Sequence, residues 1–479
     1  SVSAFLLNRS SDLRLEDVAE DDKRIRVNST KKGLIIVGIA IVLILVAIGL
    51  TLFFILSSNP KSNNYINAKY RVDYPENTVK LFDESYLDSV ESIKIDDKIE
   101  TTKNEIQFDS KKEFTLEIRF KETLTKLNDF FYLARNLTEV DLSGLDSSNI
   151  KNSYNMFYRC INLKSVKFDK FDTSKLYNIS KMFSECSSLE SINFDLSNSN
   201  ELVDVYGLFS GCTKLAKIEL GNINTNKVLN MSRLFFGCSS LKEINTGIFN
   251  TDKVTDMSNM FFNCSSLKSL NLDKFKTSNV VHMFGMFDGC SNIESLNLEK
   301  FDTKNVEDMH FMFSSCTSLK SLNIDNFDTS KVIDMFGMFK NCQKLEKINI
   351  SHFNTKNVED MGEMFAYCTS LQEITLDHLN VDNLSYMTGM FQKCTSLGSL
   401  NISSFDTKNV LDISYLLNGC KNLTALDFRG FDSSKVTNNT KVFNDLPEEG
   451  TIYYDSLKLD FSQIGDLPEK WKKVDILDI

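Results

Sequence analysis

The sequence predicts an α/β solenoid of 26-residue repeats, each a strand, a turn and a short helix, with β-rich end caps and one N-terminal transmembrane helix. Three observations lead to this prediction. The eleven cysteines of the 479-residue chain fall on one arithmetic series with a step of 26. Apolar residues keep the same phase on both sides of each cysteine. An uncharged segment of 24 residues, Gly33 to Leu56, lies near the N-terminus.

Residues 1–32 are predicted to be a cytoplasmic tail and residues 33–56 a transmembrane helix. At ~1.5 Å per residue the helix would span ~36 Å, enough to cross a hydrocarbon core of ~30 Å. Its apolar run is longer than that of a cleaved signal peptide. Lysines and arginines crowd the N-terminal flank, whereas the C-terminal flank carries only Lys61. The positive-inside rule therefore predicts a single-pass protein of the plasma membrane with a cytoplasmic N-terminus and an extracellular repeat domain.

Two β-rich caps are predicted at the ends of the repeat array. Residues 57–118 would form a juxtamembrane cap, because VESIKIDDKI and KKEFTLEIRF alternate between apolar and polar residues as strands do. Residues 447–479 would form the C-terminal cap. Its closing PEKWKKV contains Trp471, which we expect to pack within the cap.

The solenoid is predicted to cover residues 119–446. Aliphatic residues six and, usually, eight positions after the cysteine alternate like a short strand, for example Ser321–Asp325. Apolar residues ten, seven, four and three positions before the cysteine would share one face of a short helix. The preceding DTS sequence would supply a threonine or serine cap. Each repeat has a single apolar face, so it must stack on its neighbours.

The cysteines raise the question of chemistry. A column with one cysteine per repeat lacks the paired spacing of a zinc site, and buried free cysteine behaves as a small hydrophobic residue. We therefore expect a structural ladder, with occasional disulfides or a metal site as alternatives. The ladder comprises Cys160, Cys186, Cys212, Cys238, Cys264, Cys290, Cys316, Cys342, Cys368, Cys394 and Cys420.

These motifs carry a family resemblance. The LxxLxL segment after each cysteine and the FDTSxVxDMxxMFxxC segment between strands resemble the BspA-like leucine-rich repeat surface proteins. The resemblance covers roughly residues 90–479. It implies a right-handed, leucine-rich-repeat-like stack of coils at the cell surface that serves in adhesion or recognition.

Composition and motifs argue against several other functions. The net charge of −11 argues against nucleic-acid binding. Phosphate-loop, GxSxG and HExxH motifs do not occur, so we expect no enzyme, no catalytic residues and no cofactor. We expect no convergence of His282, His310, His352 and His378 on one site.

An aspartate column lies eight positions before the cysteines. Stacked carboxylates are a possible calcium site, and the alternative is a favourable position in the first turn of the predicted helix. Other residue types interrupt the column, which weakens the calcium interpretation. The column contains Asp204, Asp256, Asp308, Asp334, Asp360 and Asp412.

The exposed side of the predicted strands provides the candidate binding surface. Serine is frequent five positions after the cysteine and asparagine seven positions after it. We call this surface the recognition strip: it would bind glycans or extended protein segments. The alternative is a face that only makes the protein soluble and whose side-chain amides form a ladder with one another. Its candidate residues are Ser191, Asn193, Asn245, Ser269, Asn271, Ser295, Asn297, Ser321, Asn323, Asn349, Ser399 and Asn401.

Nine N-x-S/T sequences follow the apolar segment and are candidate glycosylation sites. Glycans on Asn349 and Asn401 would stand on the recognition strip itself. The nine are Asn136, Asn178, Asn230, Asn263, Asn349, Asn383, Asn401, Asn422 and Asn438.

Together these features predict adhesion to, or recognition of, protein or glycan ligands on other cells or matrix. One alternative is a structural protein that associates side by side or end to end into a coat or fibre. Another is a surface receptor without enzymatic activity.

Overall fold

The computed structural model describes residues 39–46, 48, 64–74, 78–101, 103–376 and 378–478. The chain divides into two units, Ser1–Asn63 and Asn64–Ile479. Residues 39–46 and 48 are helical, and the other residues of the predicted transmembrane segment and all of the predicted tail lie outside the described residues. Among the residues described, no helix has both the length and the apolar character needed to span a membrane.

The second unit begins with strands β1 (Tyr65–Val72), β2 (Thr78–Lys80), β3 (Val90–Ile95), β4 (Ile99–Thr101), β5 (Glu105–Gln107) and β6 (Lys112–Phe120). A 3₁₀ helix, η1 (Glu84–Ser89), precedes β3, and its Asp83 cap accepts a hydrogen bond from the backbone N–H of Ser85. The two alternating segments predicted as strands lie in β3 and β6. Strand β1 pairs antiparallel with β6 on one side and with β7 (Leu137–Asp141) on the other.

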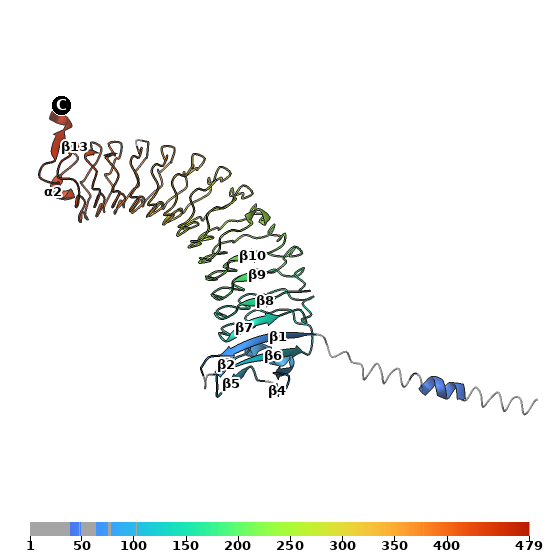
Figure 1. Ribbon diagram of the computed structural model, residues 1–479. Helices are drawn as coiled ribbons and strands as arrows, with labels where there is room; N and C mark the ends of the chain where they lie inside the picture. The colour runs from blue at the N-terminus through green and yellow to red at the C-terminus, as the bar shows by residue number, and fades with distance from the viewer. Residues whose placement is uncertain are drawn as a thin grey trace, which may run out of the picture. The chain divides into compact units, whose positions relative to one another are not determined.

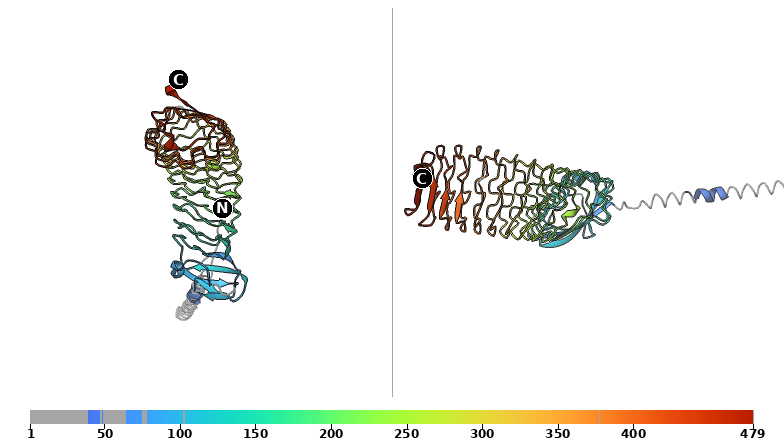
Figure 2. Two further views of the ribbon diagram at one scale, coloured as in Figure 1. Left: turned by 90° about the vertical axis from the view of Figure 1, so that its left-hand side faces the viewer. Right: turned by 90° about the horizontal axis from the view of Figure 1, so that it is seen from above.

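Strand β7 joins the cap to the repeats. It pairs in parallel with β8 (Ser165–Lys167), so one six-stranded sheet, ordered β4-β3-β6-β1-β7-β8, changes from antiparallel to parallel at the first coil. The coils then follow one another in a single row (Figures 1 and 2). This arrangement pairs the first edge of the solenoid and so protects it from other chains.

The strand side of the coils is less regular than predicted. Strands are formed by β9 (Ser191–Asn193), β10 (Lys217–Glu219), β11 (Ser399–Asn401) and β12 (Ala425–Asp427), but the predicted strand Ser321–Asp325 is not one. Near this segment, the backbone nitrogen of Lys320 lies 3.5 Å from the carbonyl oxygen of Glu294 in the preceding coil. In the turns before the cysteine, the backbone nitrogen of Ser315 lies only 2.7 Å from the carbonyl oxygen of Lys340 in the next coil. The coils therefore lie further apart along the strands, and a regular ladder is not maintained there.

The predicted short helices are absent from the described coils, and the α/β class is corrected to a β-solenoid. In the coil of Cys290, the N–H groups of Met283, Gly285, Phe287 and Gly289 all donate to carbonyls of the next coil. Between them, the N–H groups of Met286 and Asp288 donate to the carbonyls of Met283 and Gly285, three residues earlier in the same coil, and so close tight turns. In a helix, all these N–H groups would donate to carbonyls of the same segment. The segment is therefore a run of turns and not a helix.

These turns need left-handed backbone at two positions, five and one residues before each cysteine. In the coil of Cys290 both are glycine, Gly285 with φ +57° and Gly289 with φ +74°. Other coils have non-glycine residues there, for example Asn263 with φ +51°. Left-handed backbone costs roughly 1–2 kcal/mol for such residues, a cost that the hydrogen bonds between coils offset.

The DTS sequence also acts differently from the predicted helix cap. The aspartate caps a turn, as in Asp328, whose carboxylate accepts from the Ser330 N–H at 2.9 Å. The buried threonine bonds to the next coil instead. Thr277, in the equivalent KTS sequence, donates through Oγ1 to the Asp302 carbonyl at 3.0 Å and accepts from the Asp302 N–H at 2.7 Å. The threonines therefore join consecutive coils.

The core is a set of apolar columns inside the coils. The phenylalanines three residues before the cysteines, together with Phe131 at the same position of the cysteine-free first coil, stack in ten consecutive pairs up to Phe391, with ring centroids 5.3–6.0 Å apart. Each such ring is fully buried. Thirteen positions from Lys126 to Asn438, spaced by 26 residues, are linked by parallel bridges. Packing between neighbours thus repeats along the whole array.

A C-terminal cap covers the last coil. Strand β13 (Thr451–Tyr454) pairs in parallel with β12, and β14 (Lys472–Asp475) pairs with β13. Helix α2 (Phe461–Ile464) lies between them in sequence, and 3₁₀ helices η2 (Thr246–Ile248) and η3 (Ile476–Asp478) complete the short elements. Trp471 is buried and its indole N–H donates to the Pro447 carbonyl at 2.8 Å.

Candidate functional site

The recognition strip lies on the strand side of the coils, and all twelve of its candidate residues are exposed. Its asparagines also stabilise the chain. The Asn323 side-chain oxygen accepts from the Asp325 N–H at 3.1 Å, and the Asn349 amide donates to the Asp325 carboxylate of the preceding coil at 2.9 Å. These residues therefore have a structural role, which leaves the exposed serines and part of each amide for contact with a ligand.

Two depressions lie along the strip, where the strand sides of the coils separate. One contains Ser321, Asn323, Lys347, Asn349 and Glu373. The other is lined by Asn193, Glu219, Asn245 and neighbouring residues from three successive coils. Both have exposed polar and charged walls, and apolar residues such as Ile348 and Ile374 contribute to the first of them. The surface is thus hollowed at intervals.

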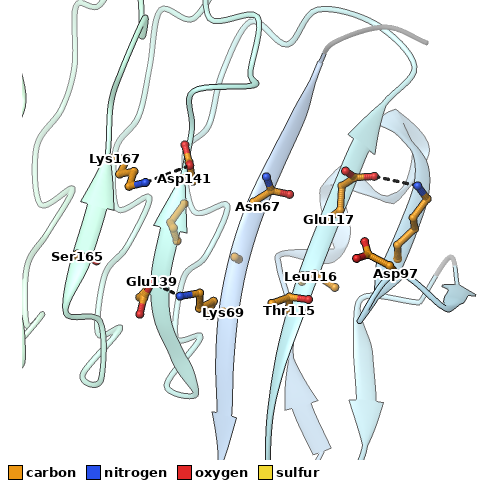
Figure 3. Close-up of a pocket in the computed structure, with 13 residues that line it drawn as sticks. Asn67, Lys69, Asp97, Thr115, Leu116, Glu117, Glu139, Asp141, Ser165 and Lys167 are labelled. Atoms are coloured by element: carbon orange, nitrogen blue, oxygen red, sulfur yellow. Dashed lines mark ion pairs between the residues drawn. The ribbon is translucent and has the colours of Figure 1, made fainter.

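A third depression, of about 300 Å³, continues this face onto the N-terminal cap (Figure 3). Charge alternates from strand to strand across it: Lys167 on β8, Asp141 and Glu139 on β7, Lys69 on β1, Glu117 on β6. Lys69 pairs with Glu139 at 2.7 Å, and Lys167 lies 3.8 Å from Asp141. Such cross-strand pairs stabilise a sheet. The charges therefore largely neutralise one another within the protein.

The aspartate column has a capping function. Asp256 accepts from the Ser258 N–H at 2.9 Å, and Asp412 accepts from the Ser414 N–H at 2.8 Å. Asn178 and Asn230 make the same bond at the same position of their coils. The column thus favours aspartate or asparagine because each bends the chain into an Asx turn, and the predicted position in a first helical turn does not exist.

One histidine lies against this column. His310 Nδ1 is 2.5 Å from the Asp308 carboxylate, and Asp334 of the next coil is close enough to form a group with them. The hydrogen bond that the His310 imidazole donates to the Asp308 carboxylate raises the pKa of the imidazole, and the negative charge of Asp334 acts in the same direction. Burial raises the pKa of the nearby Asp360 carboxyl, and the charge of Asp334 adds to that effect. The sequence prediction missed this group because it compared histidines only with one another.

The cysteines are all free and buried. Each thiol donates to the carbonyl of the phenylalanine column in the preceding coil, as Cys316 does to Phe287 at 3.2 Å. The sulfur–oxygen distances are 3.0–3.2 Å in all eleven coils. Burial raises the pKa of every thiol, that of Cys368 to about 12. These thiols are therefore poor nucleophiles.

A second surface, formed by the turns just before the cysteines, also went unrecognised in the sequence. There, cations lie over aromatic rings: Lys181 is 5.1 Å from the Tyr206 ring centroid and Arg233 is 5.4 Å from that of Phe236. A small depression between Tyr158, Tyr206, Lys181 and Arg233 opens on this surface. The aromatic residues alternate among several positions of the repeat, so no single column shows them.

The candidate glycosylation sites differ in exposure. Asn263, Asn349, Asn383, Asn401, Asn422 and Asn438 are exposed, whereas Asn136, Asn178 and Asn230 are half-buried. The Asn136 amide donates to the Arg71 carbonyl at 2.8 Å and the Asn383 amide to the Lys356 carbonyl at 2.8 Å. A glycan at either position would have to disrupt that bond.

Comparisons with known proteins were made on sequence and on structure. A family model described as "Mycoplasma protein of unknown function, DUF285" matches residues 102–215, 125–243, 203–296, 286–396 and 349–451. The search of curated proteins returned no match.

Solved structures gave more distant similarities. A leucine-rich repeat protein of T. pallidum is 23% identical, with 37% of this chain and 74% of that chain covered and a TM-score of 0.27. A Leptospira interrogans LRR protein is 13% identical over 73% of this chain and 81% of that one, with a TM-score of 0.17. The TLR13–ssRNA13 complex gives 15% identity over 66% of this chain and 49% of that one, with a TM-score of 0.20.

Proposed function

Because the chain belongs to the DUF285 family and folds as a β-solenoid of 26-residue coils, we propose that it is a single-pass cell-surface protein whose solenoid recognises protein or glycan ligands. The observation that carries the proposal is the strand face. Its exposed side chains are not part of the core, and depressions occur along it on the cap and at two places on the coils. The BspA-like resemblance of the repeats points in the same direction.

Membrane anchorage by residues 33–56 is part of this proposal. Within the described residues 39–46 and 48, the large apolar side chains are 47–63% exposed. Exposed apolar residues along a helix mark a contact with lipid or protein. The cations before the segment support a cytoplasmic N-terminus and a plasma-membrane location.

Recognition along a repeat array fits the way its side chains are presented. The coils repeat serine and asparagine at a fixed spacing, so a ligand with its own repeat, such as a glycan or an extended peptide, would meet equivalent donors and acceptors in successive coils. Lys347 and Glu373 give the depression around Asn349 charges of both signs, whereas the charged residues of the depression around Asn245 are acidic. This depression is where we expect the tightest contact.

A matched pair of variants tests the proposal. Glu373 lies on the strand face, and Glu359, also exposed, lies on the turn side of the same coil. The full chain in lipid vesicles would be tested against arrays of glycans and matrix proteins. We expect Glu373→Arg to abolish or redirect binding and Glu359→Arg to leave it intact. Equal effects of both variants, or self-assembly of the chain without any ligand, would contradict the proposal and favour a structural coat.

A further inference from the structure

Two carboxylates and one imidazole meet on the turn side of the solenoid. Asp308 and Asp334 occupy the same position in adjacent coils and are joined by a backbone bridge. His310 follows Asp308 by two residues, and one ligand atom from each of the three side chains lies within 4.8 Å of the others. All three residues are half-buried, so the group is shielded on one side and accessible to solvent on the other.

The arrangement differs from that of the other coils. Where His310 stands, four coils have a serine whose hydroxyl closes the Asx turn, as Ser258 does with Asp256. The four are Ser180, Ser232, Ser258 and Ser414. In place of a hydroxyl, His310 presents a ring nitrogen to the carboxylate.

The imidazole is held in position from the preceding coil. Its ring stacks on Phe284, with centroids 4.8 Å apart and planes 7° from parallel. The two carboxylates are fixed as well, because one oxygen of each accepts a backbone hydrogen bond, from the His310 N–H at 3.0 Å and the Phe336 N–H at 2.8 Å. Each has a second oxygen that these turns do not use.

The surrounding charge favours a cation. Asp308, Asp334 and Asp360 form the only run of three consecutive aspartates in the column. Like charges in neighbouring positions of a sheet destabilise one another, and a bound cation removes that repulsion. One imidazole with two carboxylates suits a divalent transition ion, whereas calcium prefers oxygen ligands alone.

We propose that Asp308, His310 and Asp334 bind a divalent transition-metal ion of the Zn²⁺ type, with the remaining coordination positions open to water or to a donor group of a ligand. Zinc binds imidazole nitrogen and carboxylate oxygen at about 2.0–2.2 Å. The three ligand atoms, which lie within 4.8 Å of one another, therefore have to move closer together around the ion. The site lies apart from the recognition strip and does not depend on the proposed function.

The repeats themselves supply variants that preserve the fold. Asp334→Asn introduces the residue found at this position in Asn178 and Asn230, where it caps the same turn. His310→Ser introduces the residue of Ser180 and Ser258. His352→Gln is the control, since His352 contacts the ring of Phe353 in another part of the repeat.

The test is calorimetric titration of the detergent-solubilised full chain with Zn²⁺ and, separately, with Ca²⁺. We expect one Zn²⁺ site, at least about tenfold weaker in His310→Ser and in Asp334→Asn and unchanged in His352→Gln, together with a Zn²⁺-dependent rise in melting temperature that both site variants lose. The absence of Zn²⁺ binding, equal binding by His310→Ser, an equal loss in His352→Gln, or preferential binding of Ca²⁺ would each overturn the proposal.

Discussion

The threonine that joins consecutive coils offers a sharp test of how the solenoid is held together. Thr277 is buried, and its hydroxyl makes two hydrogen bonds to a single residue of the next coil: it donates to the Asp302 carbonyl and accepts from the Asp302 N–H. Thr277→Val keeps the shape of the side chain and removes both bonds. The change therefore isolates the hydrogen bonds from packing.

The expected cost follows from the groups left without partners. An unsatisfied buried donor or acceptor costs about 1–3 kcal/mol, and Asp302 is half-buried, so that water relieves part of this penalty. We expect Thr277→Val to lower the free energy of unfolding by about 2 kcal/mol. Contacts in a repeat array are local, so the amide of Asp302 should also exchange its hydrogen faster, while distant coils keep their protection.

The chain contains its own control at this position. Val381 stands where most other coils have threonine, and it is equally buried. Val381→Thr should leave stability unchanged or raise it by up to about 1 kcal/mol. Urea denaturation followed by circular dichroism measures both variants, and hydrogen exchange locates the effect. A Thr277→Val protein with wild-type stability and unchanged exchange at Asp302 would show that these two hydrogen bonds do not hold the coils together.

Two further predictions concern the thiols and the glycines. Because burial raises the thiol pKa values, the folded chain keeps its cysteines protonated to higher pH than the unfolded chain, whose thiols ionise near 8.5. The contribution of the buried thiols to the free energy of unfolding should therefore be fully present below that pH and be lost as the pH rises towards the raised pKa values. Iodoacetamide should label the eleven cysteines only after denaturation. Rapid labelling of the native chain would contradict this expectation. Gly337 has φ +59° and a Cβ built there would lie 2.5 Å from the Phe311 ring, whereas one at Gly398 meets no atom within 4 Å. Gly337→Ala should lower the free energy of unfolding by more than about 1 kcal/mol and Gly398→Ala by much less, as measured by urea denaturation. Equal losses of stability in the two variants would contradict this expectation.

The apolar columns make the repeat predictable, because burial requires the same residue type in every coil. The 26-residue period, the stacked phenylalanines and the cysteine column are all visible in the sequence for this reason. The conformation between the columns was harder to predict. Apolar residues ten, seven, four and three positions before the cysteine suit one face of a helix, but the same residues also fit turns whose alternate N–H groups reach the next coil.

The left-handed positions explain part of that error. Five and one residues before the cysteine, the chain has glycine, asparagine and also bulky residues such as Phe311 and Tyr415. A column of mixed residue types gives no sequence signal, although every coil needs the same backbone conformation there. The hydrogen bonds between coils impose it, and these depend on stacking that a single repeat cannot reveal.

The candidate sites were predictable to different degrees. The exposure of the strip could be predicted because buried residues such as Leu322 and Ile324 alternate with polar ones along the chain. The depressions could not be predicted, because they depend on the spacing between the coils. His310 and Asp334 are 24 residues apart and in different columns, so only the stacked structure brings them together. A search of neighbouring columns across one repeat would have found this group.

The most direct test of recognition by the strand face is carboxylate footprinting of the ligand-bound full chain. Carbodiimide labelling with and without ligand reports which glutamates become covered. We expect protection of Glu373 or Glu219, which line the strand-face depressions, with unchanged labelling of Glu359. Protection of Glu359 while Glu373 and Glu219 stay fully reactive would contradict it.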